Sequence, residues 1–77
     1  MENKIIDIIE KVTNYRNLRE NLEIDLLESE ILDSLAFIEL ITELEDEFDI
    51  EIQVTQAPSD TWKNVKNIQN YVEKIKK

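Results

Sequence analysis

Residues 34–48 read SLAFIELITELEDEF and carry the clearest periodic pattern in the chain. Apolar side chains recur every three or four positions along one side of this segment, whereas acidic side chains fill the other sides. That spacing matches an α-helix with one face against a core. The apolar face comprises Phe37, Leu40, Ile41, Leu44 and Phe48. The segment therefore predicts an amphipathic helix, and the rest of the fold can be built outward from it.

Two further helices are predicted, one on each side of this segment. A first helix is expected over about residues 2–14, because apolar residues recur there at helical spacing among charged ones: Ile5, Ile8, Ile9 and Val12. Asn64 is a suitable N-cap for a last helix, whose apolar positions are Val65, Ile68, Val72 and Ile75. A short helical turn is expected at residues 59–62, directly after Pro58.

The connections are predicted from the apolar pattern, because the chain has no glycine and only one proline. Residues 15–33 hold too many apolar side chains for a disordered linker, so we expect an ordered loop that packs onto the core. The long helix is expected to end at Asp49 in a left-handed conformation. Residues 50–54, IEIQV, resemble a strand, but no partner strand is predicted, so we interpret them as an extended crossover.

The composition limits the possible functions. Seventy-seven residues without cysteine predict a single domain held by packing alone, and suit the reducing cytoplasm. The charged N-terminal segment indicates neither a signal peptide nor a membrane span. All nine basic residues lie outside residues 20–62, and the net charge is −9. Such an acidic stretch disfavours nucleic acid and anionic lipid and favours basic protein surfaces, although it is also typical of a merely solvated face.

The residues needed for catalysis are scarce. The chain has no histidine, no cysteine and no glycine-rich phosphate loop. A serine nucleophile requires a neighbouring base, and in sequence the lysines closest to Ser34 are Lys11 and Lys63. We therefore expect no autonomous enzymatic activity and no metal site.

Ser34 stands at the start of the central helix and has two possible roles. Serine is a common helix N-cap, but Asp33 precedes it and is a better candidate for that role. Leu35 and Ile38 lie off the apolar face and are expected to stay partly exposed. An exposed hydroxyl at the positive end of a helix is a suitable substrate for modification by another enzyme, and a phosphodiester there would gain from the helix dipole.

The chain resembles the acyl carrier protein family along nearly its whole length. The likeness rests on Asp33-Ser34-Leu35, then Ile38-Glu39-Leu40, in register with ELEDEFDIEI at residues 43–52. It implies an all-α fold, the acyl-carrier-protein-like four-helix bundle, with three main helices, one short helix and a long first loop. Residues 1–77 would form a single carrier domain. The resemblance also implies that a phosphopantetheinyl transferase attaches 4′-phosphopantetheine to Ser34, and that the thiol of this arm carries a thioester.

Within the family, the chain looks most like the D-alanyl carrier branch. The matching residues are Leu32-Asp33-Ser34, Ala36, Asp60-Thr61-Trp62 and Asn64. This branch supplies D-alanine to teichoic acids, and the resemblance implies two further partners, a D-alanine–carrier ligase and a membrane-bound acyltransferase. A fatty-acid, polyketide or peptidyl carrier remains an alternative, as does an acidic helical adaptor with no prosthetic group. We expect a cytoplasmic monomer whose partner-binding residues are Asp33, Leu35, Ile38, Glu39, Glu43 and Glu47.

Overall fold

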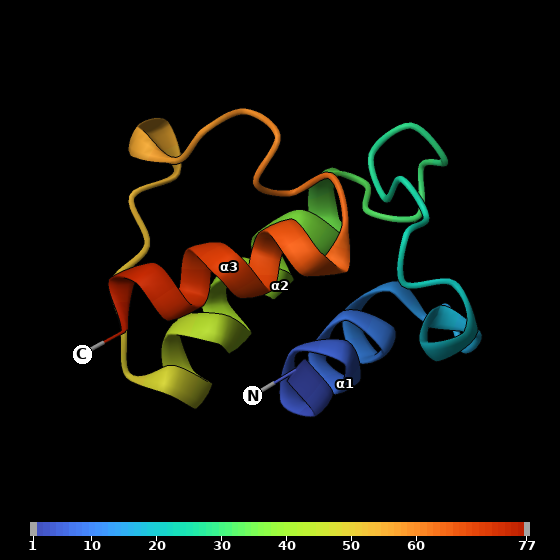
Figure 1. The fold of residues 1–77 in the computed structure, drawn as a ribbon, viewed down its shortest axis with the longest axis horizontal. Helices are drawn as coiled ribbons and strands as arrows, with labels where there is room; N and C mark the ends of the chain where they lie inside the picture. Colours follow the sequence, from blue (N-terminus) through green and yellow to red (C-terminus); the bar gives the residue numbers. More distant parts are fainter. Residues whose placement is uncertain (1, 77) are drawn as a thin grey trace.

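The computed structural model describes residues 2–76 and is helical (Figure 1). Its three α-helices are α1 (Glu2–Thr13), α2 (Ser34–Phe48) and α3 (Val65–Ile75). Two 3-10 helices lie between them, η1 (Leu18–Glu20) and η2 (Val54–Gln56). Residues 2–76 contain no strand. The all-α fold is therefore confirmed, and the predicted domain of residues 1–77 extends one residue beyond the described range at each end.

The three α-helices enclose one apolar core, and each contributes the face that its periodicity predicts. Leu40 and Leu44 of α2 are fully buried, and the fully buried side chains of α1 and α3 lie in the same cluster: Ile5, Ile9, Val65, Ile68 and Val72. Phe37, Ile41 and Phe48 are partly buried at its margin, whereas the small side chain of Ala36 is buried instead. Full burial of one leucine stabilises the fold by about 1.5–3 kcal/mol. Packing of these faces is therefore what holds the helices together.

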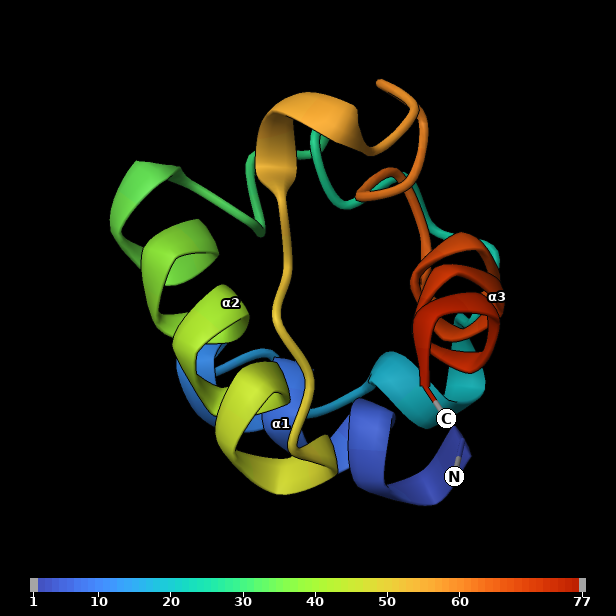
Figure 2. The same ribbon diagram turned by 90° about the vertical axis from the view of Figure 1, so that its left-hand side faces the viewer.

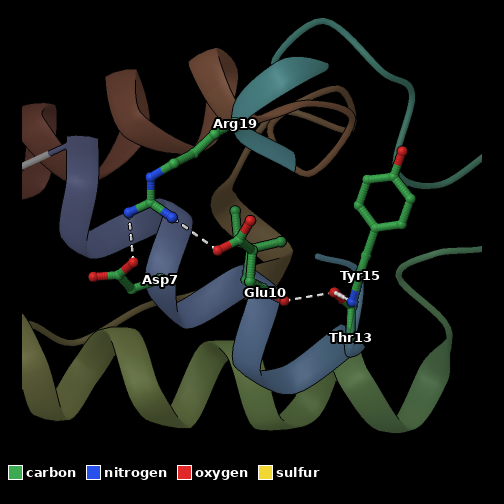
Figure 3. A network of polar contacts seen from close by, with 6 residues as sticks. Asp7, Glu10, Thr13, Tyr15 and Arg19 are labelled. Atoms are coloured by element: carbon green, nitrogen blue, oxygen red, sulfur yellow. Dashed lines mark hydrogen bonds and ion pairs between the residues drawn. The ribbon is translucent and has the colours of Figure 1, made fainter. Parts of the chain in front are cut away.

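The long first loop is ordered, as predicted, and it is attached to the core at several points. Leu18, Leu26 and Leu32 are buried. The η1 segment is also held to α1 by Arg19, whose guanidinium nitrogens lie 2.6 Å from an Asp7 carboxylate oxygen and 2.8 Å from one of Glu10 (Figure 3). The hydrogen bond to Asp7, the largest cause, raises the pKa of Arg19. The loop is therefore a structured part of the fold.

The end of α2 and the crossover that follows agree with the sequence prediction. Asp49 adopts a left-handed conformation (φ 53°, ψ 53°), and its N–H donates to the Glu45 carbonyl. The next residues are extended, and the Ile52 N–H donates to the Glu45 carboxylate at 2.9 Å. Figure 2 shows this segment rising between α2 and α3 from the end of α2. A side-chain acceptor therefore satisfies the backbone here, where a β-partner would otherwise be needed.

The short helix lies earlier than predicted. Residues 59–62 form two separate turns, in which the Thr61 N–H donates to the Pro58 carbonyl and the Lys63 N–H to the Asp60 carbonyl. The 3-10 helix between α2 and α3 is η2, at Val54–Gln56. Trp62, in the second of these turns, is buried and packs in edge arrangements against Phe37 and Tyr71, with ring centroids 5.4 and 5.7 Å apart. These are tertiary contacts, which the local sequence pattern does not reveal.

Residues 57–63 return toward the end of the molecule where α2 begins (Figure 1). The first loop meets them there, since the Leu26 N–H donates to the Lys63 carbonyl at 2.6 Å. The start of α2 is consequently surrounded by two ordered connections.

Within residues 2–76, none of the helices has both the length and the apolar character that crossing a membrane requires.

Candidate functional site

Asp33 is the N-cap of α2, as the sequence predicts. Its backbone is extended (φ −81°, ψ −177°), and its Oδ1 accepts the Ala36 N–H at 2.9 Å. The Phe37 N–H donates to the Asp33 carbonyl at 2.8 Å. Ser34 is exposed, and within residues 2–76 its hydroxyl makes no hydrogen bond. Because Asp33 already performs the capping role, the Ser34 hydroxyl is left available to an external enzyme.

The helix end favours an anionic group on this hydroxyl. The first turn of a helix presents backbone N–H groups and a partial positive charge. Phosphate groups bind well at such ends. The Asp33 carboxylate already neutralises part of this charge, so the gain is smaller than at an uncapped helix.

Large apolar side chains project into solvent beside Ser34. Leu35 and Ile38 are 67% and 62% exposed, which confirms that they lie off the core face of α2. Leu27 of the first loop is also exposed, at 44%. Sequence analysis missed Leu27, because an apolar residue in a loop rich in buried leucines is expected to be buried with them. Its neighbour Leu26 is the one that enters the core.

A groove of about 270 Å³, which we call the Ser34 groove, opens beside the hydroxyl. Four apolar side chains line it together with the N-cap and the first residue of α2: Leu27, Leu32, Phe37, Trp62, Asp33 and Ser34. The first loop, α2 and the turn before α3 each supply part of the lining. Apolar surface is therefore within reach of a group attached to Ser34.

The predicted row of acidic residues on α2 contains both ion-paired and unpaired side chains within residues 2–76. Glu43 lies 3.2 Å from the Lys11 ammonium of α1, and Glu47 lies 2.9 Å from that of Lys4. The Glu47 hydrogen bond, the largest cause, raises the pKa of Lys4. Glu39 is exposed and has no ion-pair partner within residues 2–76. Of the three predicted partner-binding glutamates, only Glu39 forms no ion pair within residues 2–76.

The structure shows no metal-binding group at this site among residues 2–76. In the described part of the chain, no group of three or more histidine, cysteine, aspartate or glutamate side chains could hold a metal ion.

Comparison with known proteins identifies the family. The family profile described as "Phosphopantetheine attachment site" matches residues 3–72, which is most of the chain. The chain belongs to this family. Its prosthetic group is 4′-phosphopantetheine, as the sequence resemblance implied. The residues present fit that group, because the start of α2 offers an exposed, unbonded hydroxyl, a positive helix end and adjacent apolar surface.

Named relatives of this attachment-site family cover nearly the whole chain. The D-alanyl carrier protein of Lactococcus lactis subsp. lactis (strain IL1403) is 40% identical over 76 residues, which are 99% of this chain and 96% of the relative. That of L. lactis subsp. cremoris (strain MG1363) is 40% identical over 68 residues, covering 88% and 86%. The D-alanyl carrier protein of Bacillus cereus (strain B4264) is 32% identical over 73 residues, covering 95% and 92%.

These matches confirm the predicted resemblance to carrier proteins. Family members act as carriers, not catalysts, and a carrier role implies partner enzymes that load and unload it. The position of the attachment residue and the partner-binding residues remain predictions, which the geometry of α2 supports and an experiment can test.

Proposed function

We propose that this chain carries D-alanine on a 4′-phosphopantetheine arm at Ser34 and delivers it, in the cytoplasm, for D-alanylation of teichoic acids. The observation that carries the assignment to Ser34 is its exposed hydroxyl, which makes no hydrogen bond within residues 2–76, while Asp33 caps the helix. The relatives named above, with 32–40% identity, support the choice of D-alanine as cargo. The arm supplies a terminal thiol that holds the aminoacyl group as a thioester.

Attachment of the arm is a phosphoryl-transfer reaction performed by a separate transferase. The Ser34 oxygen forms a bond to the phosphorus that bears the pantetheine, while the diphosphate bond of coenzyme A breaks and the nucleotide half leaves. The hydroxyl proton passes to a base of the transferase, because this chain has no histidine. The chain contributes an accessible nucleophile on a rigid helix end and has no catalytic role of its own.

Recognition by the partner enzymes would use the surface around Ser34. Leu35 and Ile38 give this surface an apolar centre, since both are more than half exposed. Asp33 and Glu39 supply negative charge beside them. Glu43 and Glu47 were predicted to contribute as well, but they must first exchange the α1 lysines for cations of a partner. Such a small, charged surface suits brief encounters with a transferase, a D-alanine–carrier ligase and a membrane-bound acyltransferase.

Mass spectrometry tests the attachment residue. The chain is incubated with coenzyme A and a phosphopantetheinyl transferase, in parallel with Ser34→Ala and Ser59→Ala. Ser59 is a matched control because it is also an exposed serine. We expect the wild type and Ser59→Ala to gain the arm and Ser34→Ala to remain unmodified. Arm transfer to Ser34→Ala would refute the assignment, and an unmodified wild type would favour the adaptor alternative.

A loading assay tests the cargo. The arm-bearing chain is presented to a D-alanine–carrier ligase with ATP and either D-alanine, L-amino acids or fatty acids. We expect thioester formation with D-alanine to exceed the others. Preferential loading by an acyl or peptidyl system would place the chain in the fatty-acid, polyketide or peptidyl branch instead.

A further inference from the structure

The walls of the Ser34 groove are held by contacts already present in the unmodified chain. Asp25 Oδ1 accepts the N–H groups of Leu27 and Glu28 at 3.0 and 2.8 Å, which fixes the turn that presents Leu27. The hydrogen bond from Leu26 to the Lys63 carbonyl ties this turn to the segment of Trp62. Because these contacts already fix the groove, the protein loses little conformational entropy when a group enters it.

The Trp62 wall is equally well supported. Its ring is held edge-on between Phe37 on α2 and Tyr71 on α3, and only 6% of the residue is exposed. Leu27, in contrast, is 44% exposed and forms the solvent side of the groove. A group that entered between them would cover apolar surface of Leu27 that now faces water, which is favourable.

The volume of the groove and the presence of Ser34 in its lining favour a short group attached to Ser34 as the occupant. At about 270 Å³ it lies below the roughly 300–1,000 Å³ of pockets that enclose a drug-sized ligand, so it admits a short segment. Ser34 itself is part of the lining, and a group tethered there has a high effective concentration at the groove. In the pantetheine arm, the segment next to the phosphate carries two methyl groups on one carbon, which makes it apolar and compact.

We propose that the Ser34 groove seats this dimethyl segment of the arm, between Leu27 and Trp62, while the carrier is not engaged by a partner. This inference rests on the proposed attachment at Ser34. The remainder of the arm and the cargo extend beyond the groove, which is open to solvent. Leu27 is the residue on which the seat depends most, because it covers the segment from the solvent side.

NMR on the arm-bearing chain tests the seat. Arm labelled with ¹³C is transferred to the wild type and to Leu27→Gln and Val54→Gln, and attachment to each is first verified by mass. Val54 is the matched control, since it is 41% exposed and does not line the groove. We expect nuclear Overhauser contacts from the two arm methyls to the Trp62 ring and Leu27 in the wild type. Val54→Gln should keep the contacts to Trp62, and Leu27→Gln should lose them.

The outcomes separate this inference from the proposed function. If the wild type carries the arm but its methyls show no contact with Trp62 or Leu27, the seat is refuted while the attachment at Ser34 stands. Contacts that persist undiminished in Leu27→Gln also refute it. If Ser34 acquires no arm, the attachment itself fails and the seat fails with it. Thermal unfolding of each variant shows whether a lost contact reflects a lost fold.

Discussion

The division of roles between Asp33 and Ser34 can be tested by measuring stability alone. In the structure, Asp33 accepts the Ala36 N–H at 2.9 Å, while the Ser34 hydroxyl makes no hydrogen bond within residues 2–76. Loss of an N-cap side chain costs about 0.5–2 kcal/mol, typically about 1. Asp33→Ala should therefore lower the free energy of unfolding by about 1 kcal/mol. In a domain of this size, that change lowers Tm by roughly 4–8 °C.

Ser34→Ala should change the free energy of unfolding by less than about 0.5 kcal/mol, because it removes an exposed hydroxyl without a partner. Asp33→Asn is a useful third variant, since asparagine caps about as well as aspartate but lacks the charge. It should be destabilised less than Asp33→Ala. Urea unfolding followed by far-ultraviolet circular dichroism gives all three values. A loss above about 1 kcal/mol in Ser34→Ala, with Asp33→Ala unaffected, would show that serine is the cap and would refute the reasoning.

Three further predictions concern packing, backbone strain and charge. Leu44→Ala should lower the free energy of unfolding by about 2–5 kcal/mol in urea titration, because Leu44 is fully buried, whereas Leu35→Ala should change it by less than about 0.5 kcal/mol. Glu30→Gly should raise Tm, since Glu30 has φ 63° and glycine tolerates this region; an unchanged or lower Tm would exclude strain there. Raised salt should weaken ligase binding measured by calorimetry, and salt-independent affinity would mean that the acidic face is only solvated.

The ion pairs between α1 and α2 change the interpretation of the acidic helix. In the sequence, three acidic residues form one row at intervals of four, and the pattern does not distinguish among them: Glu39, Glu43 and Glu47. In the folded chain, Lys11 and Lys4 lie against Glu43 and Glu47, so within residues 2–76 only Glu39 of the three has no ion-pair partner. The three glutamates are therefore not equivalent in the folded chain.

Local sequence was enough to predict the three α-helices of this fold. The periodicity of apolar residues located α1, α2 and α3, because each helix must bury one face and the spacing of that face is visible in the sequence. The caps at Asp33, Asp49 and Asn64 were also predictable, since capping depends on residues within a few positions of the helix end. The same local reasoning marked Ser34 as exposed.

Tertiary structure alone decided what lies around Ser34. Trp62 packs against Phe37 of α2 and Tyr71 of α3, and the pairing of Glu43 with Lys11 joins residues on different helices. The Ser34 groove likewise combines Leu27 with Trp62, two residues from separate loops. Such contacts arise only when the helices pack, because chain segments far apart in sequence come together through the shared core.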